Sequence, residues 1–134
     1  MKKSKDKFSA QAKEYYKFRP HYPELLHGFL YSKVQNFDRP WDCGTGNGQV
    51  AVKLAGRFKE VFATDISEKQ LKEAPAKENI TYTQSRAEKA DFPDNYFDLI
   101  TVAQAVHWFD LDSFYAEVKR VAKANAVVPL WAYN

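Results

Sequence analysis

The central part of the chain alternates between short apolar runs and segments whose apolar residues recur at helical spacing. Five strands are predicted, over residues 41–43, 61–65, 80–84, 97–103 and 126–132, and the runs at 61–65 and 97–103 are the clearly apolar ones. The helical spacing predicts three helices, over about 48–55, from 67 to a stop before 75, and from 113 to 122. Strands that alternate with helices are typical of a parallel α/β sheet, because parallel neighbours need a crossover connection.

Capping residues indicate where several of these helices begin and end. Ser67 begins a capping box, and Ser113 is the expected N-cap of the last helix. Gly56 suits the position just after the end of the 48–55 helix. Toward the C-terminus, residues 124–126 are expected to form the turn before the fifth strand. Pro129 falls inside that strand, where a central strand would lose a ladder hydrogen bond.

Two further helices are predicted before the first strand. One runs over about 10–18 with Ser9 as its N-cap, and the other runs over about 24–34 after Pro23. Residues 1–20 carry seven lysines and arginines and two acidic residues. This local excess favours a solubilising basic arm over a nucleic-acid contact.

The composition limits the class of protein. The 134 residues are 45% hydrophobic with a net charge of +3, so we expect one globular domain over residues 1–134. No apolar run is long enough to cross a membrane, and the lysine-rich N-terminus lacks the apolar segment of a secretory signal. The single cysteine, Cys43, excludes an internal disulfide and fits a reducing compartment. We therefore expect a cytoplasmic protein without a metal site and without a membrane or nucleic-acid partner.

Glycines and polar residues follow the ends of the first four predicted strands. The first strand leads into Asp42-Cys43-Gly44-Thr45-Gly46-Asn47-Gly48, a glycine-rich turn that lets the backbone approach a ligand closely. The second ends in Asp65, 17 residues after Gly48, where a carboxylate can accept both hydroxyls of an adenosine ribose. Residues 85–88 follow the third strand and residues 104–109 follow the fourth. Ligands bind at this edge of open parallel sheets, so we expect the site there.

Two nucleoside cofactors fit these intervals. Nicotinamide dinucleotide domains also pair a glycine turn with an acid about 20 residues further on. However, the spacing here is G-x-G-x-G, without the usual G-x-G-x-x-G. The polar and aromatic residues 104–109 also have no standard role in a dinucleotide site. Both details favour a cofactor other than a dinucleotide.

The chain resembles the class I S-adenosylmethionine-dependent methyltransferases, specifically the type 11 group that includes proteins similar to trans-aconitate methyltransferase. The glycine turn matches their first motif, Asp65 their acidic strand end, and Ala87-Glu88 their adenine-contacting turn. The string Ala-Gln-Ala-Val-His-Trp-Phe-Asp at 103–110 is the most specific match, and residues 8–23 resemble the subgroup's N-terminal signature. The resemblance implies a Rossmann-like parallel sheet of order 3-2-1-4-5, with helices on both faces and S-adenosylmethionine as cofactor.

The resemblance also assigns residues to the cofactor site. They are Tyr15, Arg19, Asp42, Gly44, Gly46, Gly48, Asp65, Ala87, Glu88 and Gln104. The three glycines would pack on the methionine and ribose portions, and Asp65 would bind the ribose hydroxyls. Arg19 is a candidate partner for the cofactor carboxylate, and residues 8–23 would act as a lid.

The implied reaction is methyl transfer to a small-molecule acceptor, with carboxylic acids among the candidates. Because the sulfonium is already activated, much of the catalysis can come from alignment and from the exclusion of water. A general base is needed only if the acceptor must lose a proton. His107 is the candidate catalytic residue, either as that base or as a residue that shapes the pocket beside Trp108.

The predicted strands end at the fifth, whereas complete members of the resembled family continue beyond it. The fifth strand would then be a sheet edge, whose unpaired backbone groups favour pairing with another chain. We therefore expect self-association through this strand. The alternative to an active enzyme is a non-catalytic S-adenosylmethionine-binding module or an inactive fragment, and product formation with a panel of small acids would separate the two.

Overall fold

A computed structural model describes residues 31–102 and 110–129. The first predicted N-terminal helix and most of the second lie outside these residues. Residues 31–33 are helical, which agrees with the predicted end of the second helix.

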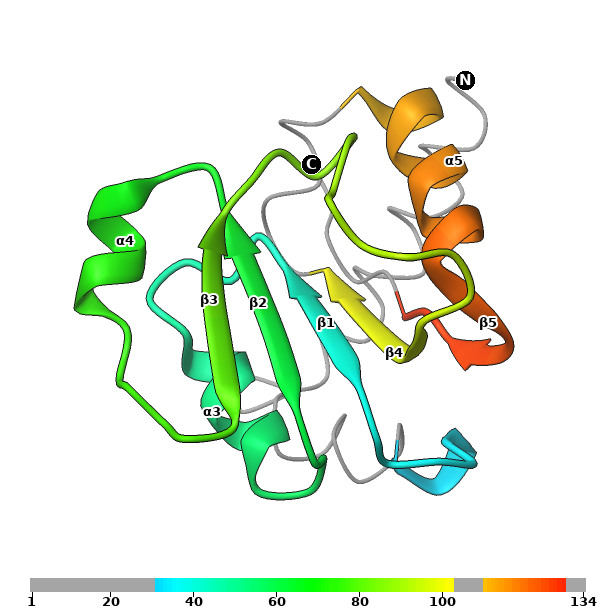
Figure 1. Ribbon diagram of the computed structural model, residues 1–134, viewed down its shortest axis with the longest axis horizontal. Coiled ribbons are helices and arrows are strands. Elements are labelled where there is room, and N and C mark those ends of the chain that lie inside the picture. The colour runs from blue at the N-terminus through cyan, green and yellow to red at the C-terminus, as the bar shows by residue number, and fades with distance from the viewer. Residues whose placement is uncertain (1–30, 103–109, 130–134) are drawn as a thin grey trace, which may run out of the picture.

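Helices and strands alternate along the described part of the chain. They are β1 (Pro40–Cys43), α3 (Gln49–Ala55), β2 (Val61–Asp65), α4 (Glu68–Glu73), β3 (Ile80–Gln84), β4 (Phe97–Val102), α5 (Leu111–Val121) and β5 (Ala122–Val127). The strands form one sheet of order β3-β2-β1-β4-β5, and all neighbours are parallel (Figure 1). The predicted fold class and strand order are thus confirmed.

Two hydrophobic clusters cover the two faces of this sheet. Ala51 and Leu54 of α3 pack in one cluster with apolar residues of β2. Phe114 and Val118 of α5 pack in the other with Trp41 of β1. Figure 1 shows α3 beside the lower ends of β2 and β3, and α5 at the opposite side of the sheet. Every residue of β4 is buried, as expected for a central parallel strand.

The predicted bounds of the fifth strand are wrong. Residues 124–126 lie inside β5 and form no turn before it, and Pro129 lies beyond its end at Val127. β5 follows α5 without a loop, because the backbone N–H groups of Asn95 and Tyr96 donate to the last two carbonyls of the helix at 2.9 and 2.7 Å. No glycine turn is therefore needed to satisfy this helix end.

The pairing of β5 with β4 is irregular. Phe97 pairs with Ala122, but Leu99 pairs with Val127, so β5 carries extra residues between the two pairs. A bulge of this kind bends the strand and disrupts the ladder locally. Self-association through β5 is not tested by a single chain and stays a prediction.

Two of the predicted helix ends differ from the structure. The side chain of Ser67 accepts a hydrogen bond from the backbone N–H of Gln70, so Ser67 is confirmed as the N-cap of α4. Ser113 is not the N-cap of α5, because the helix begins earlier and the carboxylate of Asp110 accepts from the N–H of Ser113 instead. Gly56 ends α3 at a φ of −75°, without the left-handed conformation that favours glycine at such ends.

Arg120 joins α5 to the segment that precedes β4. Its guanidinium donates to the carbonyls of Ala90 and Phe92 and to the carboxylates of Asp94 and Glu117. The charge of Arg120 lowers the pKa of Glu117, mainly through their hydrogen bond. These bonds fix the stretch that continues from the β3 end toward β4. No helix among the described residues is long and apolar enough to span a membrane.

Candidate functional site

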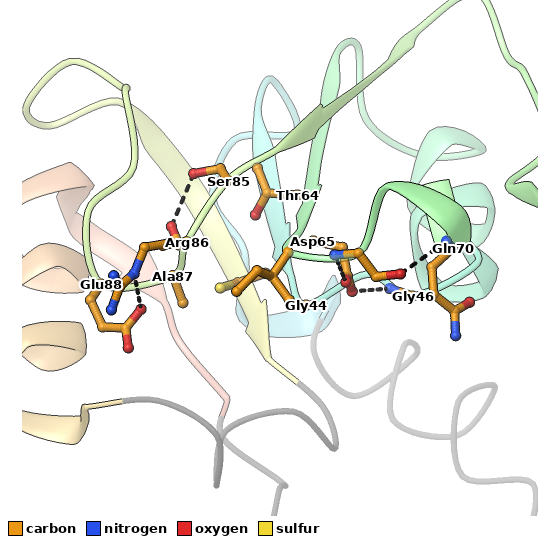
Figure 2. A pocket seen from close by; sticks show the side chains of 12 residues that line it. Gly44, Gly46, Thr64, Asp65, Gln70, Ser85, Arg86, Ala87 and Glu88 are labelled. Atoms are coloured by element: carbon orange, nitrogen blue, oxygen red, sulfur yellow. Dashed lines mark hydrogen bonds and ion pairs between the residues drawn. The ribbon is translucent and has the colours of Figure 1, made fainter. Parts of the chain in front are cut away.

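A cavity of about 530 Å³ lies where β1, β2 and β3 end (Figure 2). Its volume falls within the range of small-molecule sites, roughly 300–1,000 Å³. The residues that line it are Cys43, Gly44, Gly46, Thr64, Asp65, Ile66, Ser67, Gln70, Ser85, Arg86, Ala87 and Glu88. The cavity thus lies at the edge of the sheet that the sequence predicts.

The glycine turn supplies one wall, but its glycines differ in what surrounds them. Gly44, Gly46 and Gly48 all have positive φ values, of 72°, 61° and 84°. A β-carbon on Gly46 would meet no atom within 4 Å, so the backbone there is open to the cavity. A β-carbon on Gly48 would lie 2.7 Å from the hydroxyl of Tyr82. Gly48 therefore makes room for internal packing, and it does not line the cavity.

Asp65 connects the glycine turn to the beginning of α4. Its Oδ2 accepts a hydrogen bond from the N–H of Gly46, and its Oδ1 accepts one from the N–H of Ser67, both at 2.8 Å. An ionised carboxylate has about four lone-pair sites, so each oxygen can accept a further bond. Figure 2 shows the Asp65 carboxylate beside Gly46, with the hydrogen bond between them drawn as a dashed line. The acid is fixed in place and keeps capacity for hydroxyl donors of a ligand.

Asp42 is buried beneath the glycine turn, which it contacts through Thr45, and it does not line the cavity. Its carboxylate accepts from the hydroxyl of Thr45 at 2.6 Å and from that of Thr101 at 2.8 Å. Burial raises the pKa of Asp42 to about 6, and these two hydrogen bonds oppose the rise. Asp42 thereby ties the glycine turn to β4.

The residues after β2 and β3 form the facing wall. The N–H of Ser85 donates to the carbonyl of Asp65, and the amide of Gln84 donates to the carbonyl of Ile66, both at 3.0 Å. These bonds hold the backbone around Ile66, whose side chain is nevertheless 70% exposed. Ile66 therefore presents an exposed apolar side chain at the cavity.

Glu88 ends this wall, and its carboxylate already has partners. One oxygen accepts from the N–H of Asp110 at 2.9 Å, and the other lies 3.7 Å from the guanidinium Nε of Arg86. Ala87 beside it is buried.

Cys43 also borders the cavity, but its thiol is unreactive. Burial raises the pKa of Cys43 well above its ordinary value, and the neighbouring charge of Asp42 raises it further. A protonated, buried thiol is a poor nucleophile. The small, buried side chain of Cys43 therefore has a packing role beside the cavity.

Five of the predicted cofactor residues come together at the cavity, namely Gly44, Gly46, Asp65, Ala87 and Glu88. Asp42 and Gly48 do not line the cavity. Tyr15, Arg19, Gln104 and His107 lie outside the described residues. Within residues 31–102 and 110–129, no group of histidine, cysteine and acidic side chains could hold a metal ion.

Several lining residues were not predicted. Ile66 and Ser67 directly follow Asp65 in sequence, so the position of that acid could have indicated them. Thr64 directly precedes Asp65, so the same acid could have indicated it, whereas Gln70 lies five positions further along the chain and had no such signal.

A five-strand parallel sheet with a glycine turn after β1 and an acid at the end of β2 defines a Rossmann-like, nucleoside-binding domain. Residues 41–129 match the model of a family described as "Methyltransferase domain". The chain therefore belongs to this methyltransferase family.

Individual relatives agree with this assignment. A protein of Dictyostelium discoideum named as a methyltransferase is 42% identical over 130 residues, which are 96% of this chain and 49% of that protein. A structure from Anaeromyxobacter dehalogenans, described as a type II methyltransferase, has 38% identity and a TM-score of 0.73 over 78% of this chain and 44% of its own. A SAM-dependent methyltransferase of Aquifex aeolicus has 28% identity and a TM-score of 0.66 over 75% and 58%. The chain spans about half the length of the first of these relatives.

The cofactor that this family and these neighbours imply is S-adenosylmethionine. The described residues fit it in two respects. The open space at Gly46 admits a ligand against bare backbone, and the spare lone pairs of Asp65 suit the two hydroxyls of a ribose.

Proposed function

We propose that this chain carries the cofactor site of a methyltransferase that acts on a small-molecule acceptor, with carboxylic acids among the candidates. The observation that carries the proposal is Asp65, whose carboxylate is fixed by two backbone N–H groups at the cavity. Because the Asp65 carboxylate is already held in place, it loses little conformational entropy when it accepts hydrogen bonds from a ligand.

The lining residues suggest how each part of the cofactor binds. Asp65 accepts the ribose hydroxyls, and the open backbone at Gly46 packs against the ribose and methionine portions. Ile66 supports one face of the adenine, and the stretch Ala87-Glu88 lies at its edge. Asp42 acts indirectly, because its bonds to Thr45 and Thr101 hold the glycine turn in place.

The remaining predicted residues belong to the reacting end of the site. Tyr15 and Arg19 cover the cofactor in this proposal, with Arg19 near its carboxylate. Gln104 lies beside the methionine portion. His107 either takes a proton from the acceptor or shapes the pocket around it.

S-adenosylmethionine supplies a methyl group on a positively charged sulfur that leaves as a neutral thioether. The protein then has to align the acceptor with that methyl group and exclude water. A carboxylate acceptor reaches this site already ionised and requires no base. In that case His107 has only a shaping role.

Calorimetric titration with S-adenosylhomocysteine, the demethylated product, tests the cofactor site. Replacing Asp65 by alanine should weaken binding by roughly 1.5–3 kcal/mol, the scale for hydrogen bonds to a charged group. Glu60→Ala is the matched control, because Glu60 is an exposed acid at the other end of β2. Equal affinity in Asp65→Ala and the wild type would remove Asp65 from the site.

A non-catalytic S-adenosylmethionine-binding module is the second candidate function, since the cavity residues described here belong to the cofactor site alone. Incubation with labelled S-adenosylmethionine and a panel of small carboxylic acids separates the two. Binding without methylated product supports the module, whereas product formation supports the enzyme.

A further inference from the structure

Glu88 lies between the cavity and the beginning of α5. Its side chain lines the cavity and is only 14% exposed. Its Oε2 accepts a hydrogen bond at 2.9 Å from the backbone N–H of Asp110, a residue 22 positions further along the chain. One carboxylate therefore joins the cavity wall to a distant helix.

Asp110 is the residue on which the first turn of α5 depends. Its Oδ1 accepts from the N–H of Ser113, and its carbonyl accepts from the N–H of Phe114 at 2.8 Å. The side chain of Phe114 is fully buried in the core cluster that includes Trp41. The bond from Asp110 to Glu88 thus fixes a capping residue, and through it the first core contact of the helix.

The carboxylate of Glu88 also forms an ion pair with a second residue that lines the cavity. Arg86, whose guanidinium Nε lies 3.7 Å from Oε1, belongs to the same wall. Figure 2 shows the side chains of Arg86 and Glu88 turned toward each other at the end of that wall. A ligand that packs against this wall restricts both side chains.

We propose that Glu88 is a positioning residue that couples occupancy of the cavity to the order of the first turn of α5. The coupling rests on the proposed cofactor site. Ligand contact with the wall confines Glu88, which then holds the N–H of Asp110 for a larger fraction of the time. Such coupling is reciprocal, so loss of the contact to Asp110 also weakens ligand binding.

Three variants separate this role from a purely local one. Glu88→Ala removes the acceptor, Glu88→Gln keeps an amide oxygen that can accept from Asp110, and Arg86→Ala removes only the ion pair. Amide hydrogen exchange of Asp110, Ser113 and Phe114 is measured by NMR, with and without S-adenosylhomocysteine. Exchange at Val52 in α3 serves as the control for an intact fold.

Without ligand, Glu88→Ala should speed exchange at Asp110 about fivefold or more, consistent with loss of a hydrogen bond to a charged group. Arg86→Ala should stay within about twofold of the wild type, and Glu88→Gln, which keeps a neutral acceptor, should fall between the wild type and Glu88→Ala. In the wild type, S-adenosylhomocysteine should slow exchange at Asp110 and Ser113. In Glu88→Ala, this effect of the ligand should be lost, although Val52 is unchanged.

Two results would overturn the proposal in different ways. The first is that S-adenosylhomocysteine binds the wild type but slows exchange at Asp110 by the same factor in the wild type and in Glu88→Ala. In that case Glu88 does not couple the cavity to α5, and the cofactor site stands. If the wild type shows no binding, the cofactor site fails, and the coupling to its occupancy fails with it.

Discussion

The cavity wall and the junction of α5 with β5 are held by opposite kinds of hydrogen bond. At the cavity, the carboxylate of Asp65 accepts from the backbone N–H groups of Gly46 and Ser67. At the junction, the guanidinium of Arg120 donates to the backbone carbonyls of Ala90 and Phe92.

The difference shows which of the two regions can also bind a ligand. Arg120 has five N–H donors, and its five bonds to carbonyls and carboxylates use all of them. Asp65 uses only part of its accepting capacity for the protein. The protein therefore uses every donor of Arg120 at the junction, whereas Asp65 at the cavity keeps accepting capacity for a ligand.

The largest effect that separates the two regions is expected for Arg120→Ala. The variant removes a donor from two backbone carbonyls and two carboxylates, of which Glu117 keeps the backbone N–H of Ala90, so the free energy of unfolding should fall by about 2–4 kcal/mol. Affinity for S-adenosylhomocysteine should stay within about threefold, because the glycine turn and Asp65 are untouched. Urea denaturation and calorimetry measure the two quantities.

Lys119→Ala is the matched control for that variant, because Lys119 is an exposed neighbour on the same helix. Its stability should change by no more than about 0.5 kcal/mol. A loss of ligand affinity as large as the loss of stability in Arg120→Ala would show that the two regions are not independent.

The next largest effect concerns the pH dependence of stability at the cavity side. The pKa of Asp42 is about 6 in the folded protein, above its ordinary value of 3.8. The native state then binds its proton more tightly, so the stabilisation it gives is complete below about pH 4 and is lost as the pH rises through 6. Asp42→Asn removes this dependence, and its stability relative to the wild type should rise by up to about 3 kcal/mol between pH 4 and pH 7.5.

Urea denaturation of both proteins at several pH values measures the difference directly, because all other acids are shared. For Glu60→Gln, at an exposed position, the plot of stability against pH should run parallel to that of the wild type. Parallel curves for Asp42→Asn as well would mean that the pKa of Asp42 is not raised by its burial.

The smallest effect compares two glycines within the turn itself. Gly48→Ala places a β-carbon against the hydroxyl of Tyr82 and should cost about 2 kcal/mol or more of stability. Gly46→Ala meets no protein atom and should cost about 1 kcal/mol, the strain of a positive φ. Its β-carbon points into open space beside the cavity, so it should weaken ligand binding more than Gly48→Ala does.

Adding Tyr82→Phe to Gly48→Ala sharpens this comparison, because it removes the hydroxyl that the β-carbon would meet. Part of the lost stability should return in the double variant. Equal losses of ligand affinity in the two glycine variants would contradict the distinction between them.

Local signals in the sequence were sufficient for the elements that surround the cavity. The run Ile80–Gln84 is rich in β-branched and aromatic residues, and the observed strand has the same bounds. Ser67 and Pro75 carry their own capping and stop chemistry, so α4 begins and ends where they indicate. Asp65 and the glycine turn meet because parallel strands end at a common edge of the sheet.

The sequence was misleading where backbone groups are satisfied by residues distant in the chain. Ser113 looked like a cap, but Asp110 caps α5, and the backbone N–H of Asp110 is held by the distant Glu88. Strand five was expected after a turn at 124–126. The structure needs none, because Asn95 and Tyr96 satisfy the end of α5.

What the sequence by itself determined is therefore the fold class, the edge of the sheet at which the cavity lies, and the residues that local rules bring there. Only the tertiary structure decided that Gly46 faces the cavity whereas Gly48 faces Tyr82. It also decided that Asp65 and Glu88 hold backbone N–H groups as well as lining the cavity. The physical reason is that periodicity and capping act within a few residues, whereas these contacts join residues 19 and 22 positions apart.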